Sequence, residues 1–173
     1  MTMTNISSEM HAAVGRVLNR AVSHPVGEND IRRWALAVYW PEEPPAEFLD
    51  VEAAQASAHG DMVAPEEFNP FAWSVASTES AGSAPRDAND PDSTEGQLGI
   101  SGPGLKFMLN GGMECEYGVR IRPGDVITST RTLADYSERE GRLGLMLFTR
   151  FEELWTNQDG ETVKKTAMTL IRY

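Results

Sequence analysis

Residues 120–128 read RIRPGDVIT, and the turn inside this stretch sets the frame for the last third of the chain. The Pro-Gly-Asp triplet at 123–125 is a turn signal. From Val126 onward, successive side chains alternate between two faces, as they do in a β-strand. Taken alone, the stretch predicts an ordinary hairpin entrance, so the segments around it decide which kind of sheet it belongs to.

The rest of this third is predicted to form long strands. The predicted strands cover residues 113–121, 125–134, 143–155 and 161–173. The third of them, LGLMLFTRFEELW, is apolar on both faces at its centre, which is typical of a central strand. The polar residues 135–141 are predicted to connect two strands, and Asn-Gln-Asp-Gly at 157–160 predicts a tight hairpin turn.

The first third predicts helices, after a segment at 14–26 that fits either a strand or a short helix. The apolar face of the first clear helix is formed by Ile31, Trp34, Ala35 and Val38. Asn29 is predicted to cap the start of this helix, and Pro41 is predicted to end it. A second, short helix is predicted over 50–58, with Asp50 as its cap.

A third helix is predicted to begin near Pro65, because proline suits the first position of a helix. The segment from Phe68 to Val75 is the predicted cover of the sheet's apolar face. Helices followed by a run of long antiparallel strands indicate an α+β fold, with the helices on one face of the sheet.

Residues 77–104 differ in composition from the rest of the chain. They contain five acidic residues, one arginine and many Ser, Gly and Pro residues, which leaves little apolar surface to bury. A segment of this length without secondary structure is either a functional lid or a mobile loop, and a mobile surface loop is favoured. Residues 1–173 are otherwise predicted to form one domain.

Charge and composition exclude several classes of partner. The net charge of −11 argues against nucleic acid and anionic membranes, which both attract basic surfaces. No apolar run approaches the length of a membrane helix, and no signal peptide is recognisable. Cys115 is the only cysteine, so a disulfide within the chain is impossible and a cytoplasmic location is expected. No metal site is predicted.

Four segments carry a resemblance to a known family. They are PVGENDIRRWA at 25–35, AHGDMVAP at 58–65, LNGGMECEY at 109–117 and IRPGDV at 121–126. In their order and spacing, the chain resembles the MaoC-like dehydratases and (R)-specific enoyl-CoA hydratases of the hot-dog fold. It is most similar to the N-terminal, or first-half, type of that family. The resemblance covers most of residues 25–173, and only the 77–104 segment is unmatched.

The resemblance implies a curved antiparallel sheet wrapped around a central helix. It also implies that two such units pair, either as two copies or as this chain with a MaoC-like partner subunit. The implied ligands are acyl thioesters of coenzyme A or acyl carrier protein, bound as substrates, with no other cofactor. The implied reaction is the reversible addition of water to an enoyl thioester, as in fatty-acid or steroid side-chain metabolism.

Hydration of an enoyl thioester needs a base, an acid and N–H groups that stabilise charge on the thioester oxygen. Active members of the family supply the acid and base with an Asp and a His on the loop after the first helix. In this chain the corresponding residues, 37–50, contain no histidine. With Asp50 as the point of alignment, Phe48 stands where histidine is expected, and a phenyl ring cannot transfer a proton.

Other side chains could replace the missing pair. Glu42 or Glu43 would serve as a lone acid or base if burial raised its pKa toward neutrality. Exposed loop charge is the simpler interpretation of both carboxylates. His59 and His24 are the nearby histidines, and a structural or solvent-facing role is favoured over catalysis for each of them.

Three groups are candidates for contact with the ligand. The aromatic side chains near the missing pair are Tyr39, Trp40, Phe48, Phe71 and Trp73. Core packing is the simpler interpretation of this group, and a wide pocket for a bulky or ring-containing acyl chain is the functional one. The candidates for ligand phosphates are Arg120, Arg122 and Arg131. The N–H groups at 64–67, from Ala64 and Pro65 onward, are the candidates for the thioester oxygen.

One function is favoured, and two alternatives stay open. The chain is predicted to be the acyl-thioester-binding subunit of an enoyl-CoA hydratase or 3-hydroxyacyl thioester dehydratase, paired with a MaoC-like partner that carries the Asp/His pair. It would then be a component of a hydro-lyase. The first alternative is a non-catalytic, homodimeric acyl-CoA-binding module. The second is a hydratase or thioesterase that uses a carboxylate, at Glu42 or Glu43, or at Glu66 or Glu67.

Overall fold

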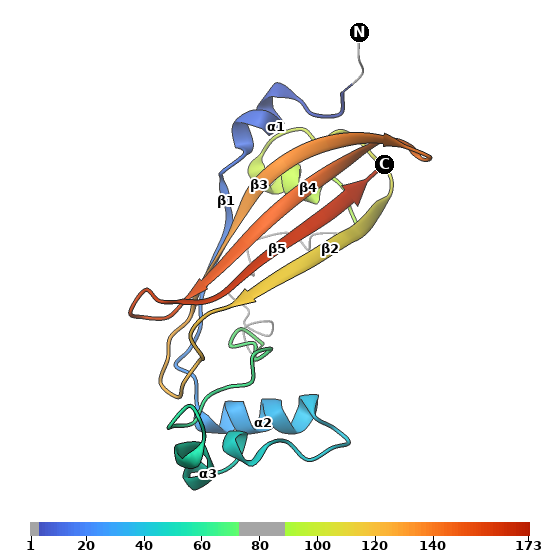
Figure 1. Ribbon diagram of the computed structural model, residues 1–173. Coiled ribbons are helices and arrows are strands. Elements are labelled where there is room, and N and C mark those ends of the chain that lie inside the picture. The colour runs from blue at the N-terminus through green and yellow to red at the C-terminus, as the bar shows by residue number, and fades with distance from the viewer. Residues whose placement is uncertain (1–3, 73–88) are drawn as a thin grey trace.

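The computed structural model describes residues 4–72 and 89–173, and its main feature is one antiparallel sheet of five strands (Figure 1). The strands are β1 (Val17–Val22), β2 (Met108–Tyr117), β3 (Thr128–Gly141), β4 (Gly144–Thr156) and β5 (Thr162–Arg172). They lie in the order β1-β3-β4-β5-β2, so β1 and β2 form the two edges. Figure 1 shows a curved sheet, and the α+β prediction is therefore confirmed.

Strand β3 is longer than predicted, because the polar residues 135–141 continue it instead of connecting two strands. Its ladder with β4 continues through Asp135 to Gly141 and Gly144, which face each other at the hairpin end. A register shift between Leu133 and Asp135 marks a bulge. Because of this bulge, Leu133 and Tyr136 both face the core, although they are three residues apart and regular alternation would place them on opposite faces.

Strand β2 begins at Met108, five residues before its predicted start. The cause is a bulge at Gly111 and Gly112, where the register against β5 shifts. Gly112 has a φ of 120°, and a Cβ atom on Gly111 would lie 2.9 Å from the Ile171 side chain. The glycines therefore interrupt the alternation in the sequence without interrupting the strand.

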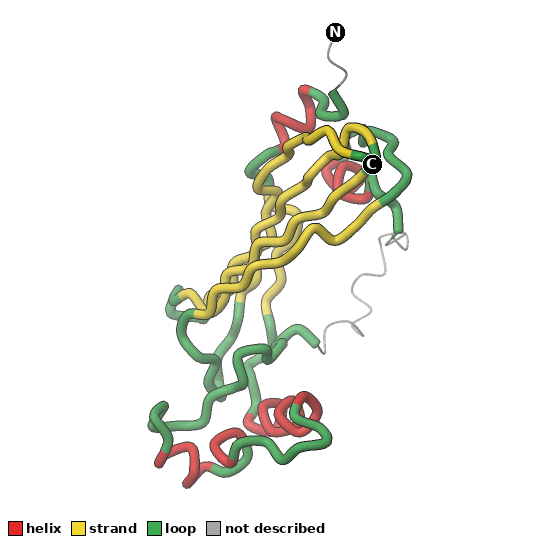
Figure 2. The backbone as a smooth tube through the Cα atoms, turned by 45° about the vertical axis from the view of Figure 1, so that its right-hand side comes forward, coloured by secondary structure: helices red, strands yellow, loops and turns green. Residues whose placement is uncertain are grey.

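Five helices accompany the sheet in the described part of the chain. They are α1 (Ser8–Ala13), α2 (Glu28–Val38), the 3₁₀ helix η1 (Ala46–Phe48), α3 (Val51–Ala56) and α4 (Ser93–Leu98). Within these ranges, no helix is long and apolar enough to cross a membrane. Helices α2 and α3 lie beyond one end of the sheet, whereas α1 and α4 lie near the other end (Figures 1 and 2).

The ends of α2 and α3 test the predicted caps. Asp50 caps α3 as predicted, since its carboxylate accepts a hydrogen bond from the Ala53 N–H at 2.9 Å. Asn29 is not the cap of α2, which was a wrong prediction. The helix begins at Glu28. The carboxylate of Asp30, in the first turn, accepts a hydrogen bond at 3.1 Å from the N–H of Gly27, the residue that precedes the helix.

The helix predicted to begin near Pro65 is absent, and turns occupy residues 66–72 instead. Pro65 and Pro70 leave too few residues between them for a helix with a full set of hydrogen bonds. The Asn69 side chain accepts the N–H of Phe71 at 2.9 Å, and this local bond competes with helix formation. Of the predicted cover from Phe68 to Val75, residues 68–72 are not helical and residues 73–75 lie outside the described part.

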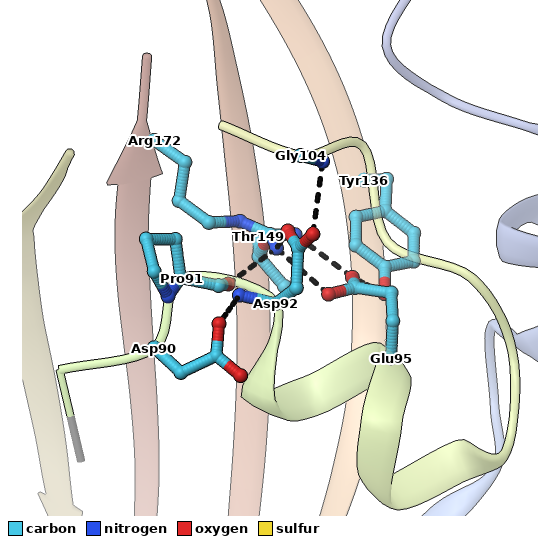
Figure 3. Close-up of polar contacts among 8 residues, drawn as sticks. All are labelled: Asp90, Pro91, Asp92, Glu95, Gly104, Tyr136, Thr149 and Arg172. Carbon is cyan, nitrogen blue, oxygen red and sulfur yellow. Dashed lines mark hydrogen bonds and ion pairs between the residues drawn. The ribbon is translucent and has the colours of Figure 1, made fainter. Parts of the chain in front are cut away.

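The prediction of a structureless segment at 77–104 fails for its described part, because α4 lies there. Glu95 of α4 and Arg172 of β5 are both 0% exposed and form a bidentate ion pair, with N–O distances of 2.7 and 2.8 Å (Figure 3). Thr149 accepts a further hydrogen bond from Arg172, and Tyr136 donates one to Glu95. Because Arg172 neutralises Glu95, this acidic side chain can be buried although its cation is distant in the sequence. Residues 77–88 lie outside the described part.

The core is divided between the two ends of the sheet. One cluster gathers residues of α1, α4, β3 and β4: Met10, Ala13, Leu98, Leu133, Tyr136, Leu147 and Phe151. The other gathers residues around α2 and α3: Val26, Ile31, Ala54, Met62, Ala64, Phe68, Ile121, Ile127 and Val163. Burial of apolar side chains in each cluster holds a different set of helices against the sheet.

The turn at 122–125 connects the second cluster to the sheet. The Gly124 N–H donates to the Val26 carbonyl at 2.7 Å, and the Val26 N–H donates to the Asp125 carbonyl at 2.9 Å. The Asp125 carboxylate accepts the Arg122 N–H at 2.8 Å and the Gln158 amide at 3.0 Å. The turn therefore fixes the chain before α2 against the β4–β5 hairpin.

Candidate functional site

A hollow of about 470 Å³ lies where the end of α2, η1 and the turn at 65–67 meet. It is lined by Val38, Tyr39, Glu47, Phe48, Pro65, Glu66, Glu67 and Arg120. Most of these positions were predicted from the sequence as ligand contacts or as candidate carboxylates. The fold thus brings together segments that are far apart in the chain.

Phe48 forms the buried wall of this hollow. It is 5% exposed and packs with Ala35 and Val63 in a small core cluster. The rings of Tyr39 and Phe48 are tilted against each other, with centroids 6.1 Å apart. At the position where the family is expected to carry histidine, this chain therefore presents an aromatic wall without a titratable group.

The loop after α2 does not place its other candidates in the hollow. Glu42 and Glu43 are exposed, so the burial that would make either a proton-transfer group at neutral pH is not present. Trp40 is 81% exposed and does not line the hollow. Among the candidate aromatics of this loop, Tyr39 and Phe48 alone line it in the part of the chain that the structure describes.

Arg120 is held rigidly at the edge of the hollow. Its Nε and Nη2 atoms donate to the Ala64 carbonyl at 3.2 and 2.7 Å, and Nη1 lies 3.2 Å from a Glu66 carboxylate oxygen. The Arg120 side chain is 23% exposed, whereas that of Glu66 is 54% exposed. The Arg120 guanidinium is therefore fixed by the Ala64 carbonyl, whereas its ion-pair partner Glu66 is mostly exposed to solvent.

The predicted oxyanion site at the start of a helix is not formed, since no helix begins at 64–67. The Ala64 N–H donates to the Ile121 carbonyl at 2.8 Å, and Pro65 has no N–H. The N–H groups of Glu66 and Glu67 have no hydrogen-bond acceptor among the described residues. The N–H groups of Glu66 and Glu67 on a turn therefore lie where a helix N-terminus was predicted.

Arg122 and His59 belong to a second, open hollow of about 510 Å³ next to the first. The Arg122 side chain is 45% exposed, donates to the His59 carbonyl at 3.3 Å and lies 3.8 Å from the Asp61 carboxylate. His59 is half-buried, and its N–H donates to the Ser57 hydroxyl. His24 is exposed near the end of β1. Neither histidine lies in the hollow that contains Phe48.

The remaining predicted contacts lie elsewhere. Phe71 packs edge-on against Trp155, with ring centroids 5.2 Å apart, as part of the core. Arg131 lies on the sheet with its guanidinium 4.5 Å from the centroid of the Phe151 ring and lines neither hollow. Trp73 lies outside the described residues.

One charged group beside the hollow, Lys164, was not among the residues predicted to contact the ligand. The Lys164 ammonium on β5 lies 5.2 Å from the ring centroids of both Tyr117 and Trp155 and 3.5 Å from the Glu67 carboxylate. The Tyr117 hydroxyl donates to the same carboxylate. Tyr117 and Trp155 are the direct cross-strand neighbours of Lys164, so strand register alone reveals this cluster.

The hollow combines an apolar wall, the Arg120 cation and two N–H groups that have no acceptor among the described residues, and such groups suit a ligand with an apolar chain and a polar head. In the described part of the chain, no group of three or more His, Cys, Asp or Glu residues could hold a metal ion. No histidine lines the hollow. The groups in its lining that could transfer a proton are the Tyr39 hydroxyl and the carboxylates of Glu47, Glu66 and Glu67.

The sequence of this chain matches one known protein family. The sequence profile of the family described as "FAS1-like, dehydratase domain region" matches residues 12–166. Comparison with curated proteins finds no match.

Solved structures with similar folds include dehydratases and hydratases. The structure of the ChsH1-ChsH2 complex from Mycobacterium tuberculosis matches with a TM-score of 0.61 and 20% identity, over 90% of this chain and 83% of that chain. A MaoC-like dehydratase from Rhodospirillum rubrum matches with a TM-score of 0.54 and 23% identity, over 93% and 92%. The R-hydratase PhaJ1 from Pseudomonas aeruginosa matches with 0.55 and 14%, over 92% and 81%. At these identities, the similarity shows the hot-dog fold.

Proposed function

This chain belongs to the family of FAS1-like dehydratase domain regions, and from that premise we propose that it is the acyl-thioester-binding subunit of an enoyl-thioester hydratase or dehydratase. In this proposal a second hot-dog subunit supplies the acid and base. The present chain supplies a wall and charged groups that hold the thioester.

The observation that carries the proposal is the identity and burial of Phe48. A functional acid–base group must reach the ligand and exchange protons with it. Phe48 stands where the resemblance leads us to expect the histidine, is 5% exposed and packs in a core cluster. The nearest carboxylates in the loop, Glu42 and Glu43, are exposed. These features favour binding over proton transfer by this chain.

The size and lining of the hollow support a thioester ligand. Its volume of about 470 Å³ lies within the ordinary range of ligand pockets, roughly 300–1,000 Å³. Tyr39 and Phe48 offer apolar contact for an acyl chain. The N–H groups of Glu66 and Glu67, which have no acceptor among residues 4–72 and 89–173, offer donors to a thioester carbonyl oxygen.

An edge of the sheet supports pairing with another hot-dog subunit. Strand β2 and its flanks expose large apolar side chains: Phe107, Leu109, Met113, Tyr117 and Val119. An unpaired edge strand with such side chains favours addition of another strand. The similar structure from M. tuberculosis is a complex of two named components, ChsH1 and ChsH2. We therefore infer a hetero-oligomer, with a homodimer as the alternative.

Activity measurements with and without a partner test the proposal. The partner to express is the product of a neighbouring reading frame that carries an Asp and a His on the loop after its first helix. We expect the isolated chain not to hydrate enoyl-CoA thioesters and the co-purified complex to hydrate them. Robust hydration by the isolated chain would refute the proposal.

Variants of the loop carboxylates sharpen this test. Glu42→Gln and Glu43→Gln in the complex should leave kcat unchanged, because neither carboxylate transfers the proton. Replacement of the proton-transfer residues of the partner should abolish activity. A loss of activity in Glu42→Gln or Glu43→Gln would instead favour a lone carboxylate in this chain.

The edge-strand inference has its own variant. Met113→Asp places a charge on the exposed edge, where Met113 is 63% exposed, and should prevent complex formation in size-exclusion chromatography. Leu154→Asp is the matched control, because Leu154 is 41% exposed on β4, which has neighbours on both sides. Equal effects of the two variants would argue against β2 as the interface.

A carboxylate-based thioester hydrolase is the second candidate. Glu66 and Glu67 line the hollow, whereas Glu42 and Glu43 do not. Each of the two is paired with a cation, at 3.2 Å to Arg120 and 3.5 Å to Lys164. Release of free thiol from acyl-CoA by the wild type, with loss in Glu66→Gln or Glu67→Gln, would establish this function.

A further inference from the structure

Lys164 is a fixed cation at the end of the sheet. Its side chain is 13% exposed, and its ammonium lies 5.2 Å from the ring centroids of Tyr117 and Trp155. Aromatic faces attract a cation, and they also restrict where it can move. The ammonium is therefore held in place by two rings on neighbouring strands, independently of its carboxylate partner.

The carboxylate that pairs with Lys164 is much less fixed. Glu67 lies on the turn at 65–67, and its side chain is 69% exposed. The Lys164 ammonium and the Tyr117 hydroxyl both point their donors at it. Ion pairs with exposed partners contribute little free energy. An anion from solution that reached these two donors could replace Glu67 at low cost.

Arg120 and Glu66 form a second pair of this kind, in which the cation is fixed and the carboxylate is exposed. Arg120 is held by two hydrogen bonds to the Ala64 carbonyl, and its exposed partner Glu66 meets the remaining Nη1 atom. Arg120, Lys164 and Tyr117 line one further pocket, together with Glu66, and with Glu66 in place its volume of about 10 Å³ has room for about one water molecule. Two positioned cations thus border one space, and two consecutive exposed carboxylates neutralise them.

We propose that Lys164 and Tyr117, together with Arg120, form an anion-binding site, and that Glu67 and Glu66 occupy its donors when no ligand is bound. The ligand chemistry is an anionic group of a thioester: a carboxylate on the acyl chain or a phosphate of the thiol carrier. This inference rests on the proposed function for the nature of the ligand. It extends that function by assigning charged residues to the recognition of an anion.

Titration calorimetry with three coenzyme A compounds tests the site. Succinyl-CoA and butyryl-CoA have acyl chains of equal length and differ by a terminal carboxylate, and free coenzyme A carries the phosphates alone. The variant Lys164→Met keeps the apolar stem and removes the charge. Lys165→Met is the matched control, because the adjacent Lys165 side chain lies on the opposite face of β5.

Lys164→Met should weaken binding by about tenfold, and Lys165→Met should not change it. Glu67→Gln should tighten binding, because it removes the charge that competes for Lys164 and Tyr117. A loss confined to succinyl-CoA identifies the acyl carboxylate as the bound anion. An equal loss for all three compounds identifies a carrier phosphate. Wild-type affinity of Lys164→Met for all three compounds would overturn the site.

A separate probe distinguishes failure of the site from failure of the proposed function. If wild-type protein binds none of the coenzyme A compounds, the proposed thioester function fails. The thermal midpoint is then measured with inorganic pyrophosphate. A rise in the wild type and in Lys165→Met, but not in Lys164→Met, retains the anion site. The same result for all three proteins overturns it.

Discussion

Strand β5 carries a cation near each end, and the two ends use charge in opposite ways. Arg172 and its partner Glu95 are both 0% exposed and share two short hydrogen bonds. Lys164 is 13% exposed, and its partner Glu67 is 69% exposed. The two cations lie on the same face of β5, because eight residues separate them and side chains alternate; the rise of a strand places them ~26 Å apart.

The comparison shows that the exposure of the anionic partner determines what a paired cation can do. At the Arg172 end, both charges have lost their water, so neither can leave without a large cost. At the Lys164 end the carboxylate keeps its water and can be replaced. We therefore interpret the first pair as an attachment of α4 and the second as a ligand-accessible site.

The largest expected effect comes from breaking the closed pair. Arg172→Met leaves Glu95 buried without its cation, and the free energy of unfolding should fall by about 3–5 kcal/mol. Urea denaturation followed by circular dichroism measures this change. The double variant Glu95→Met with Arg172→Met removes both of these charges and should recover part of the loss, because Asp92, 3.5 Å from Arg172, still loses its cation. A double variant as unstable as the single one would contradict the role of the unpaired charge.

The second effect is a dependence on alkaline pH at the same end. Burial, and then the Glu95 carboxylate that accepts its hydrogen bond, raise the pKa of Tyr136 well above its ordinary value. The native state thus keeps this proton at a pH where the unfolded state loses it. The resulting stability is fully present below pH ~10 and falls by about 1.4 kcal/mol per pH unit above it.

Tyr136→Phe isolates this effect from that of other groups. The variant should lose about 1 kcal/mol at neutral pH, because Glu95 loses one hydrogen bond. Above pH ~10 its unfolding free energy should fall less steeply than that of the wild type. Parallel curves for the two proteins in urea denaturation at increasing pH would show that Tyr136 ionises equally in both states.

The smallest effect is expected at the open end. Glu67→Gln should change the free energy of unfolding by less than ~1 kcal/mol, because the Glu67 side chain is 69% exposed and its charge stays hydrated. The same urea experiment measures it, with the exposed Glu116→Gln on β2 as control. A loss as large as that of Arg172→Met would mean that Glu67 fastens its turn to the sheet, and the distinction between the two ends would fail.

Local sequence patterns predicted much of the fold. The apolar centre of β4 and the turn at 157–160 placed β4 and β5 to within one residue at each end, and the alternation beyond the 123–125 turn located the first half of β3. Errors arose where a local rule met a distant contact. Asp135 to Gly141 read as a connector, but its backbone pairs with β4. The acidic sequence of α4 was predicted to be a loop, but Glu95 forms an ion pair with Arg172, 77 residues away in the sequence.

The candidate site was predicted in part. Tyr39, Phe48, Pro65 and Arg120 line one hollow, as their selection as ligand contacts required. Trp40 and Arg131 were also predicted to contact the ligand, and the structure places both away from that hollow. Lys164 was not among the predicted ligand contacts, because its aromatic neighbours are recognisable only once the register of three strands is known.

The sequence by itself determined which chemistry is available: a phenylalanine where an acid–base histidine was expected, acidic pairs, and a turn that begins a strand. Residue identity is enough for such conclusions, because a phenyl ring has no proton to exchange in any environment. Only the tertiary structure decided how each charge is used. The strength of an ion pair depends on how much water its partners keep, and burial is a property of the packed fold.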